Sequence, residues 1–492
     1  MSLSRRSLFL AGAGAGLASM TWPATSVRAA APRVLRLESY QIEIAGRAAT
    51  RFRVVQPDGT EGLALDEGDE FDVRVENTLT EPSGLHWHGL VEPWRQDGVP
   101  YLSAPPIEPG GSADYRFPAL PTGTRWMHSH FGLQEQNLLA APLIIREASA
   151  IRSGIQEVVI LLEDFSWRSP EEILAGLRNP APSSGGMAGM QMPGMQTSAM
   201  PGMAMPDAPS AGTPMAGMAM SGPDLNDVEY DHFLANRRTL DDPDVVEVEK
   251  GSEVRLRIIN ASASTNFTID VGPGGGSLLT VDGSPVQPVS VRQVPLATAQ
   301  RADILVRMPA DGSALPILAL VEGRNRQAGI VLRPKGAPVS KLGEMSDQAG
   351  PRLTLDFEAT LRTAESFAAK PADRTVPIDL TGDMARYAWF MQVHDMIGLP
   401  VTAERGERVE ITMRNTTGMA HPMHLHGHVF QVVAIDGKRF AGAVRDTVLV
   451  TPNSTVTIAF DADNPGLWAF HCHNLYHMAV GMFTTLVYRG FA

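Results

Sequence analysis

The stretch GDEFDVRVEN (68–77) decides the fold, because the same pattern returns as GSEVRLRIIN (251–260) and GERVEITMRN (406–415). Each copy begins with glycine, alternates apolar residues with mostly polar or charged ones, and ends at an asparagine nine residues after the glycine. Alternation with a period of two is typical of a strand with one buried face. The chain is therefore predicted to contain three copies of one β unit.

A second alternating run follows later in each copy, between turns rich in proline and glycine. The apolar positions of these runs are Tyr115/Phe117, Ile304/Val306 and Val456/Ile458/Phe460. The chain shows little helical periodicity. We therefore expect an all-β protein of three Greek-key β-sandwich domains, at residues 31–148, 149–340 and 350–492.

Length, charge and cysteine content narrow the function classes. A chain of 492 residues suits about three compact units. The formal net charge of −13 argues against nucleic acid or an anionic membrane as a partner, and is compatible with cationic substrates, metal ions included. Cys472 is the only cysteine, so no intrachain disulfide holds the fold together.

Residues 1–30 are predicted to be an export signal. Arg5 and Arg6 precede a Gly/Ala-rich apolar run that ends near Met20, and small residues at 27–31 offer a cleavage site. The apolar run is shorter than the roughly 20 residues that a membrane span needs. The segment resembles a twin-arginine signal, so we expect export to the periplasm by the twin-arginine machinery and no stable membrane anchor.

Four His-x-His pairs stand in register with the repeat. Nine residues beyond the first and third asparagines come HWH (86–88) and HLH (424–426), whereas the same count in the second copy reaches IDV (269–271). HSH (128–130) and HCH (471–473) follow in domains one and three. Residues i and i+2 of a strand project to the same face, so each pair offers two imidazoles to a metal. The eight histidines predict a metal cluster between domains one and three, although nitrogen ligands alone suit copper, zinc, nickel or iron.

Cys472 narrows the choice of metal. His421 stands three residues before the third pair, His477 five residues after the cysteine, and Met482 five further on. Two histidines, one cysteine and a distant methionine form the ligand set of a blue-copper electron-transfer site. Domain one has no such site, because its equivalent positions hold Ser83, Ser129, Gln134 and Leu139.

HWHG (86–89), HSH (128–130), HPMHLHGH (421–428) and HCHNLYHMAVGM (471–482) resemble the four copper motifs of the three-domain multicopper oxidases. That family includes laccases, bacterial cuprous oxidases and copper-resistance oxidases, and the resemblance runs from about Ala31 to the C-terminus. It implies cupredoxin-like domains and four copper ions per chain. The implied ligands are His421, Cys472, His477 and Met482 for type 1 copper; His86 and His424 for type 2; and His88, His128 and His473 with His130, His426 and His471 for the type 3 pair.

The resemblance also implies the reaction. One-electron donors are oxidised at the type 1 copper, and O2 is reduced to water at the cluster, with Cys472 joined to it through His471 and His473. Asp97 matches an acidic residue that relays protons in the family, and the alternative is a turn residue in Gln96-Asp97-Gly98. Met478 replaces a glutamate of many bacterial members, so either another group such as Glu135 relays protons or oxygen reduction is slower.

The remaining histidines and several methionines do not fit the register. His232, His394 and His428 are expected to be surface or hydrogen-bonded residues. Met384, Met391 and Met396 flank His394, and we expect them to pack in the core or in loops. An accessory copper site is the alternative.

Residues 184–221 form a methionine-rich segment within domain two. The motif M-x-G-M-x-M occurs at 187–192, 200–205 and 215–220, which places Met187, Met190, Met192, Met200, Met203, Met205, Met215, Met218 and Met220. The glycine and proline content predicts a flexible segment, and soft thioethers select Cu(I). Met419 matches a methionine of the substrate Cu(I) site described in cuprous oxidases, although Thr417 stands where an acidic partner is expected.

We therefore expect a monomeric periplasmic multicopper oxidase that oxidises Cu(I) for copper tolerance and phenols as a second activity. One alternative is a dedicated laccase whose methionine segment only aids copper loading. An alternative of another class is a non-catalytic copper carrier.

Overall fold

The computed structural model describes residues 31–179, 225–365 and 370–491. The predicted export signal and the methionine-rich segment 184–221, with its nine candidate Cu(I) ligands, lie outside the described residues. Within the described ranges the longest helix has nine residues, so none of these helices can span a bilayer.

The first sandwich consists of two four-stranded sheets. One sheet has the order β2 (Arg47–Val55), β1 (Arg33–Ile44), β4 (Glu70–Asn77) and β6 (Ser112–Pro118); the other has β3 (Leu63–Asp66), β8 (Ala140–Arg146), β7 (Gly123–Ser129) and β5 (Leu85–His88). A short 3-10 helix, η1 (Trp94–Gln96), follows β5, and α1 (Ala148–Ser153) follows β8. Leu37 and Val73 of one sheet share a buried core with Trp87 and Leu143 of the other.

The second sandwich pairs a six-stranded with a five-stranded sheet. The first has the order β10 (His232–Ala235), β9 (Gln156–Phe165), β12 (Glu253–Asn260), β17 (Arg301–Arg307), β14 (Gly276–Val281) and β15 (Ser284–Val291). The second has β11 (Val245–Glu247), β19 (Gln327–Arg333), β18 (Leu315–Val321), β13 (Phe267–Asp270) and β16 (Gln293–Leu296). Helix α2 (Pro170–Arg178) begins at a capping box formed by Ser169 and Glu172.

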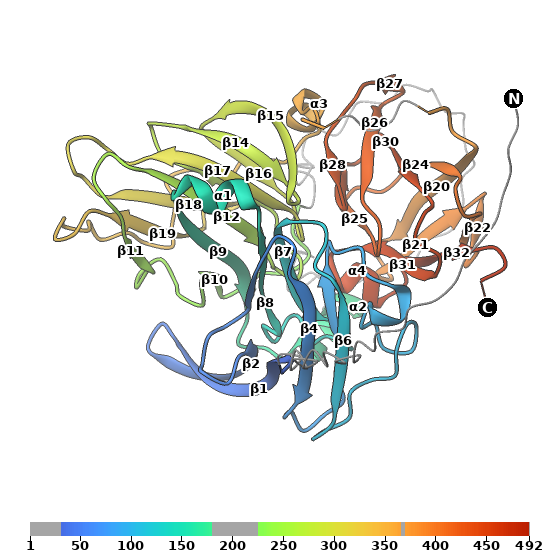
Figure 1. Cartoon of the computed structure of the whole chain (residues 1–492), viewed down its shortest axis with the longest axis horizontal. Coiled ribbons are helices and arrows are strands. Elements are labelled where there is room, and N and C mark those ends of the chain that lie inside the picture. Colours follow the sequence, from blue (N-terminus) through green and yellow to red (C-terminus); the bar gives the residue numbers. More distant parts are fainter. Residues whose placement is uncertain (1–30, 180–224, 366–369, 492) are drawn as a thin grey trace, which may run out of the picture. The chain divides into compact units, whose positions relative to one another are not determined.

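The third sandwich pairs an eight-stranded with a five-stranded sheet. The first has the order β22 (Met396–Ile397), β21 (Ala388–Val393), β20 (Arg374–Asp383), β24 (Arg408–Asn415), β30 (Thr455–Asp461), β26 (Phe430–Ile435) and β27 (Lys438–Arg439), with β28 (Val444–Arg445) also on β26. The second has β23 (Val401–Ala403), β32 (Phe483–Tyr488), β31 (Leu467–Cys472), β25 (His421–Leu425) and β29 (Thr447–Val450). Two short helices, α3 (Asp356–Thr360) and α4 (Leu475–Ala479), complete the described elements. In Figure 1 the three sandwiches run from blue through green and yellow to red.

The predicted repeat is confirmed as one strand in the same place three times. β4, β12 and β24 each lie between a parallel neighbour, which is β1, β9 or β20, and an antiparallel neighbour, which is β6, β17 or β30. The second alternating runs predicted from the sequence are these antiparallel neighbours. Each copy therefore delivers the chain to the opposite sheet at the same point, where β5, β13 or β25 begins.

The asparagine that ends each copy explains why the turn repeats. Asn77, Asn260 and Asn415 are buried, and each side-chain oxygen accepts a hydrogen bond from the backbone N–H two residues later. Each side-chain amide donates to two backbone carbonyls, one from the same turn and one from a more distant segment. An asparagine can close such a turn because its side chain mimics a backbone unit.

Strand β12 departs from the prediction of one buried face. Its residues are buried on both faces, and Arg257 is 0% exposed. Arg255 and Arg257 form ion pairs with Glu147, from the end of the first sandwich, and with Asp303 of β17. The alternation correctly indicated which residues of β12 are polar. Their side of the strand is covered by another sandwich and does not face solvent.

Candidate metal centres

The four His-x-His pairs meet between the first and third sandwiches. β5 pairs with β7 so that His86 lies opposite His128, and β25 pairs with β31 so that His424 lies opposite His471. Three groups of ring nitrogens each lie within 4.8 Å of one another: His86/His88/His424, His88/His128/His473 and His130/His426/His471. We call these eight residues the histidine cluster. The second sandwich contributes none of them, as predicted, and the buried Ile269 stands at the equivalent place in β13.

The outward nitrogen of most of these rings is anchored by an oxygen. Nδ1 of His86 contacts the Asp97 carbonyl, Nδ1 of His128 contacts the Ser129 carbonyl, and Nδ1 of His424 contacts the Asp446 carbonyl. Nδ1 of His426 contacts the Asp97 carboxylate, and Nδ1 of His471 contacts the Cys472 carbonyl. Their Nε2 atoms are thereby left for the interior of the cluster, where Nε2 of His471 lies 3.0 Å from that of His426 and 3.3 Å from that of His130.

His88 is the exception, because its Nε2 is the anchored nitrogen. It lies 3.0 Å from Asp446 Oδ1 and 3.1 Å from Thr447 Oγ1. Nδ1 of His88 and Nε2 of His86 and His424 are buried without a hydrogen-bond partner. Buried polar atoms are rarely left unpaired, so three such nitrogens facing one space fit bound metal ions.

Burial keeps the imidazoles neutral. Desolvation, aided by neighbouring imidazoles, holds the pKa well below its ordinary value in His88, His128, His130, His421, His424, His426 and His473. Burial also lowers the pKa of His471 to about 4. Neutral imidazole is the form that binds metal, so the cluster is ready to bind at neutral pH.

Cys472 forms a second group with His421 and His477. The Nδ1 atoms of the two histidines lie 3.0 Å apart, and each lies 3.7 Å from Cys472 Sγ. Metal–nitrogen and metal–sulfur bonds of roughly 2.0 and 2.3 Å give donor separations of this size. Burial raises the pKa of the Cys472 thiol, so the thiolate forms on metal binding. One thiolate with two imidazoles fits copper.

Met482 and Met419 both lie next to this cysteine group. Met482 is 0% exposed, and its backbone exchanges hydrogen bonds with Cys472 and His477. Met419 is 4% exposed, and the hydroxyl of Thr417 lies 2.8 Å from Nε2 of His421. A polar contact therefore occupies the position where an acidic partner of Met419 was expected.

The first sandwich fills the equivalent of the cysteine group with a polar network. The hydroxyls of Ser83 and Ser129 both donate to Oε1 of Gln134 over 2.7 Å. Nε2 of Gln134 donates to Glu81 and to the Pro82 carbonyl. The residues predicted to replace the type 1 ligands thus meet and satisfy one another, which leaves no donor set for a metal there.

Two predicted proton-relay candidates touch the histidine cluster. The Asp97 carboxylate is 0% exposed and lies 2.8 Å from Nδ1 of His86 and 3.1 Å from Nδ1 of His426, so Asp97 is more than a turn residue. Glu135 lies 2.8 Å from Nδ1 of His128, and burial raises its pKa well above the ordinary value. Glu92, which the sequence reasoning did not single out, is fully buried, and its carboxyl interacts with that of Asp97.

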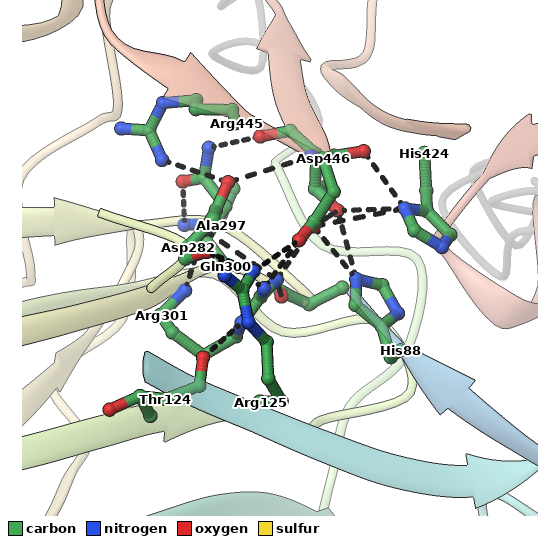
Figure 2. A network of polar contacts seen from close by, with 12 residues as sticks. His88, Thr124, Arg125, Asp282, Ala297, Gln300, Arg301, His424, Arg445 and Asp446 are labelled. Atoms are coloured by element: carbon green, nitrogen blue, oxygen red, sulfur yellow. Dashed lines mark hydrogen bonds and ion pairs between the residues drawn. The ribbon is translucent and has the colours of Figure 1, made fainter. Parts of the chain in front are cut away.

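Asp446 was also missed, and it mirrors Asp97. Asp97 contacts His86 of its own sandwich through its carbonyl and its carboxylate, and His426 of the other through its carboxylate. Asp446 binds His424 of its own sandwich through its carbonyl and His88 of the other through its carboxylate. Figure 2 shows Asp446 between the two histidines and a group of arginines. Charged residues inside the apolar run AVRDTVLV (443–450) were the available signal, since such residues are buried only when paired.

Gly89 of the HWHG motif is required by this arrangement. Its φ is +88°, and a Cβ there would lie 2.6 Å from both Arg301 Nη2 and Asp446 Oδ2. Only glycine allows the ion pair to approach the backbone just beyond His88.

Asp227 is a further missed residue, beside the cysteine group. Its Oδ2 lies 2.8 Å from Nε2 of His477 and accepts a hydrogen bond from the Tyr387 hydroxyl at 2.8 Å, while its Oδ1 is buried without a partner. A cavity of about 390 Å³ is lined by Asp227, Tyr387, Met384 and part of α2. No local pattern links residue 227 to residue 477, so only the fold brings them together.

The other three histidines belong to neither the histidine cluster nor the cysteine group. His428 is buried and bonded to the His426 carbonyl and the Tyr488 hydroxyl, His232 contacts Glu344, and His394 is exposed. Met391 is buried, whereas Met384 and Met396 are exposed. Each histidine is thus a surface or hydrogen-bonded residue.

Comparison with known proteins identifies the family. Three multicopper oxidase family profiles match residues 54–150, 202–332 and 369–490, more than half of the chain. The chain is 32% identical to multicopper oxidase MmcO of Mycobacterium tuberculosis (strain ATCC 25618 / H37Rv) over 430 residues, 86% of this chain and 80% of that one. It is 27% identical to copper resistance protein A of Escherichia coli over 536 residues, 86% of each chain.

Among solved structures, the fold is similar to that of Fet3p, a multicopper oxidase that functions in iron import. The TM-score is 0.72 at 19% identity, covering 93% of this chain and 90% of that one. The chain therefore belongs to the multicopper oxidases, copper-containing oxidoreductases built from three cupredoxin-like β-sandwiches.

Proposed function

We propose that this chain couples one-electron oxidation of Cu(I) and of phenols at a type 1 copper to reduction of O2 to water at a trinuclear copper cluster. Four copper ions are proposed. Type 1 copper takes His421, Cys472, His477 and Met482; type 2 takes His86 and His424; and the type 3 pair takes His88, His128 and His473 with His130, His426 and His471.

The observation that carries the proposal is the position of Cys472. It belongs to the cysteine group, while its two sequence neighbours, His471 and His473, belong to two different groups of the histidine cluster. Copper, when bound, supplies one-electron redox chemistry at both places. The backbone of residues 471–473 then provides a short covalent path between the donor side and the oxygen side. Burial of both groups excludes bulk water from the reaction.

The carboxylates divide into two duties. Asp97 contacts the imidazoles of His86 and His426, and Glu135 contacts the imidazole of His128. They orient these rings, and we propose that they also carry the protons that oxygen reduction consumes. Asp227 serves the donor side, where its carboxylate contacts His477 beside a cavity and favours the approach of a cation or a phenol.

Copper tolerance in the periplasm is the proposed physiological role. Relatives named copper resistance protein A support it, as do the predicted twin-arginine signal and the thioethers of residues 184–221. The second candidate function, a laccase for organic phenols, is favoured by the cavity that Asp227 and Tyr387 line next to His477. The ratio of Cu(I) to phenol oxidation rates decides between them.

The test of the oxidase itself is metal content with oxygen consumption. Copper-loaded protein should bind four copper ions per chain, show the visible absorption band of a copper–thiolate bond, and consume O2 with Cu(I) and with a phenol. Copper binding without O2 consumption would establish a carrier instead.

Asp227→Asn should raise KM for both donors by about tenfold, because a hydrogen bond to a charged group is lost. The visible band should remain, since Asp227 contacts His477 on the side away from Cys472. Glu171→Gln removes an exposed charge from α2 and is the matched control, with no change expected. An unchanged KM in Asp227→Asn would remove Asp227 from the donor site.

Deletion of residues 184–221 should slow Cu(I) oxidation at low copper concentration and leave phenol oxidation intact. The reason is that soft thioethers would no longer capture Cu(I). The control replaces the nine methionines of the three motifs by leucine and keeps the segment length. If both variants match the wild type in Cu(I) oxidation and copper tolerance, the capture role is wrong and the segment is at most a loading aid.

A further inference from the structure

The described residues of the second sandwich contribute none of the proposed copper ligands, yet two of them support the histidine cluster. Arg301 of β17 forms an ion pair with Asp446, donating from Nη1 to Oδ1 over 2.7 Å and from Nη2 to Oδ2. Gln300, next in the chain, donates from Nε2 to the Thr447 carbonyl over 3.1 Å. Asp446 and Thr447 are the residues that contact Nε2 of His88.

Arg301 is itself held rigidly. It is 0% exposed, and its remaining donors bind the carbonyls of Thr124, Asp282 and Ala299. Asp282 accepts from the Arg301 backbone and forms an ion pair with Arg445, the residue before Asp446. These contacts hold the guanidinium fork in the orientation drawn in Figure 2.

The two mirrored aspartates differ in this support. Asp97 and Asp446 each bind two histidines, but only Asp446 is paired with arginines, which are Arg301 and, at 3.5 Å, Arg125. The side group against Asp97 is the carboxyl of Glu92. The histidines that the Asp97 carboxylate contacts, His86 and His426, are anchored through Nδ1, whereas His88 is anchored through Nε2.

A fixed carboxylate beside one ring nitrogen selects the tautomer of an imidazole. Both oxygens of Asp446 accept hydrogen bonds from Arg301, so Asp446 acts on His88 as an acceptor. The proton of neutral His88 is then placed on Nε2, and the lone pair on Nδ1 faces the cluster. Without Arg301, the Asp446 carboxylate would keep only the Thr447 hydroxyl at 3.0 Å and Arg125 at 3.5 Å, and both tautomers of His88 would be populated.

We propose that Arg301 is a positioning residue for the trinuclear cluster: acting through Asp446, it holds His88 in the Nε2-protonated tautomer with Nδ1 directed to the metal. The second sandwich is thus a clamp on the cluster between the other two. This inference rests on the proposed copper cluster for its consequence, and its first readout needs no copper.

Nitrogen NMR of copper-free protein labelled with 15N-histidine tests the clamp. In wild type, His88 should carry its proton on Nε2, and His86, His424 and His426 should carry it on Nδ1. His421 and His477 also place Nε2 against an oxygen, so the Nε2-protonated signal of His88 is identified as the one that disappears in His88→Gln. Arg301→Lys keeps the charge and loses the fork, so His88 should become a mixture of tautomers. Cu(II) affinity should fall about 10–100-fold, the usual effect of losing a group that orients a ligand.

Arg257→Lys is the matched control. Arg257 is equally buried, lies in the neighbouring strand of the same sheet and pairs with Glu147, Glu157 and Asp303 rather than with Asp446. It should leave the His88 tautomer and the copper affinity as in wild type.

The outcomes separate the clamp from the oxidase. A wild-type His88 protonated on Nδ1 overturns the clamp, and this measurement needs no variant to fold. Arg301→Lys with wild-type tautomer and affinity overturns it as well. If the copper-free protein shows the expected tautomers but the copper-loaded protein consumes no O2, the clamp is supported and the proposed function is overturned.

Discussion

Cys472→Ser should abolish the visible absorption band and O2 consumption together, while three of the proposed four copper ions remain bound. A serine hydroxyl is a much poorer copper ligand than a thiolate. The cysteine group would therefore keep only His421 and His477, whose Nδ1 atoms lie 3.0 Å apart. The histidine cluster contains no atom of the cysteine side chain, so its copper should stay. Loss of activity should exceed the roughly 100-fold effect of altering a residue behind a ligand.

The matched control for Cys472→Ser is Ser129→Ala. Ser129 has the same place between His128 and His130 that Cys472 has between its two histidines, and its hydroxyl bonds only Gln134 and the Phe131 N–H. It should keep the band, the activity and the copper content. Copper per chain, the absorption spectrum and the O2 uptake rate are measured on the same preparations. A band or an activity that survives in Cys472→Ser would end the type 1 assignment.

Periodicity in the sequence predicted most of the fold, for a physical reason. A strand with one buried face must alternate, and the same turn must be closed by the same asparagine, so the repeat was visible at residues 77, 260 and 415. The prediction was incomplete at β12, where Arg257 alternates like a solvent-facing residue but pairs across an interface. Alternation reports polarity, and it cannot report that a second sandwich covers the polar side.

The histidines and Cys472 that the structure brings together were predictable, whereas Asp446 and Asp227, which contact them, were not, again for a physical reason. A metal ligand pair must lie on one strand face, which fixes its spacing as His-x-His. A carboxylate that orients a ligand has no such constraint, and Asp227 and Asp446 reach His477 and His88 from other sandwiches or loops. Asp97 was found only because, nine residues after His88, it matches an acidic residue of the family that the copper motifs resemble.

Asp446→Asn should lower the free energy of unfolding of the copper-free protein by about 3–5 kcal/mol, the cost of breaking one partner of a buried ion pair. Arg301, Asp446 and Asp282 are each 0% exposed, and Arg125 is 1% exposed. In wild type the network balances three arginines against three carboxylates, namely Arg125, Arg301 and Arg445 against Asp282, Asp446 and Glu358. Removing one negative charge leaves the network with an excess positive charge where water cannot reach it. Asp282 lies 3.7 Å from Arg301 but is already shared with Arg445.

The same substitution at the surface gives the contrast that makes this result interpretable. Asp114→Asn breaks a two-pronged pair with Arg74 that is largely exposed, 62% and 43%, so solvent screens both charges and the denaturation midpoint should hardly move. Urea denaturation of copper-free wild type and both variants, followed by tryptophan fluorescence, measures the difference. Asp446→Asn should also bind less copper, because His88 loses its anchor. Equal denaturation midpoints for the two variants would contradict this prediction. The buried charges would then orient His88 without stabilising the contact between the three sandwiches.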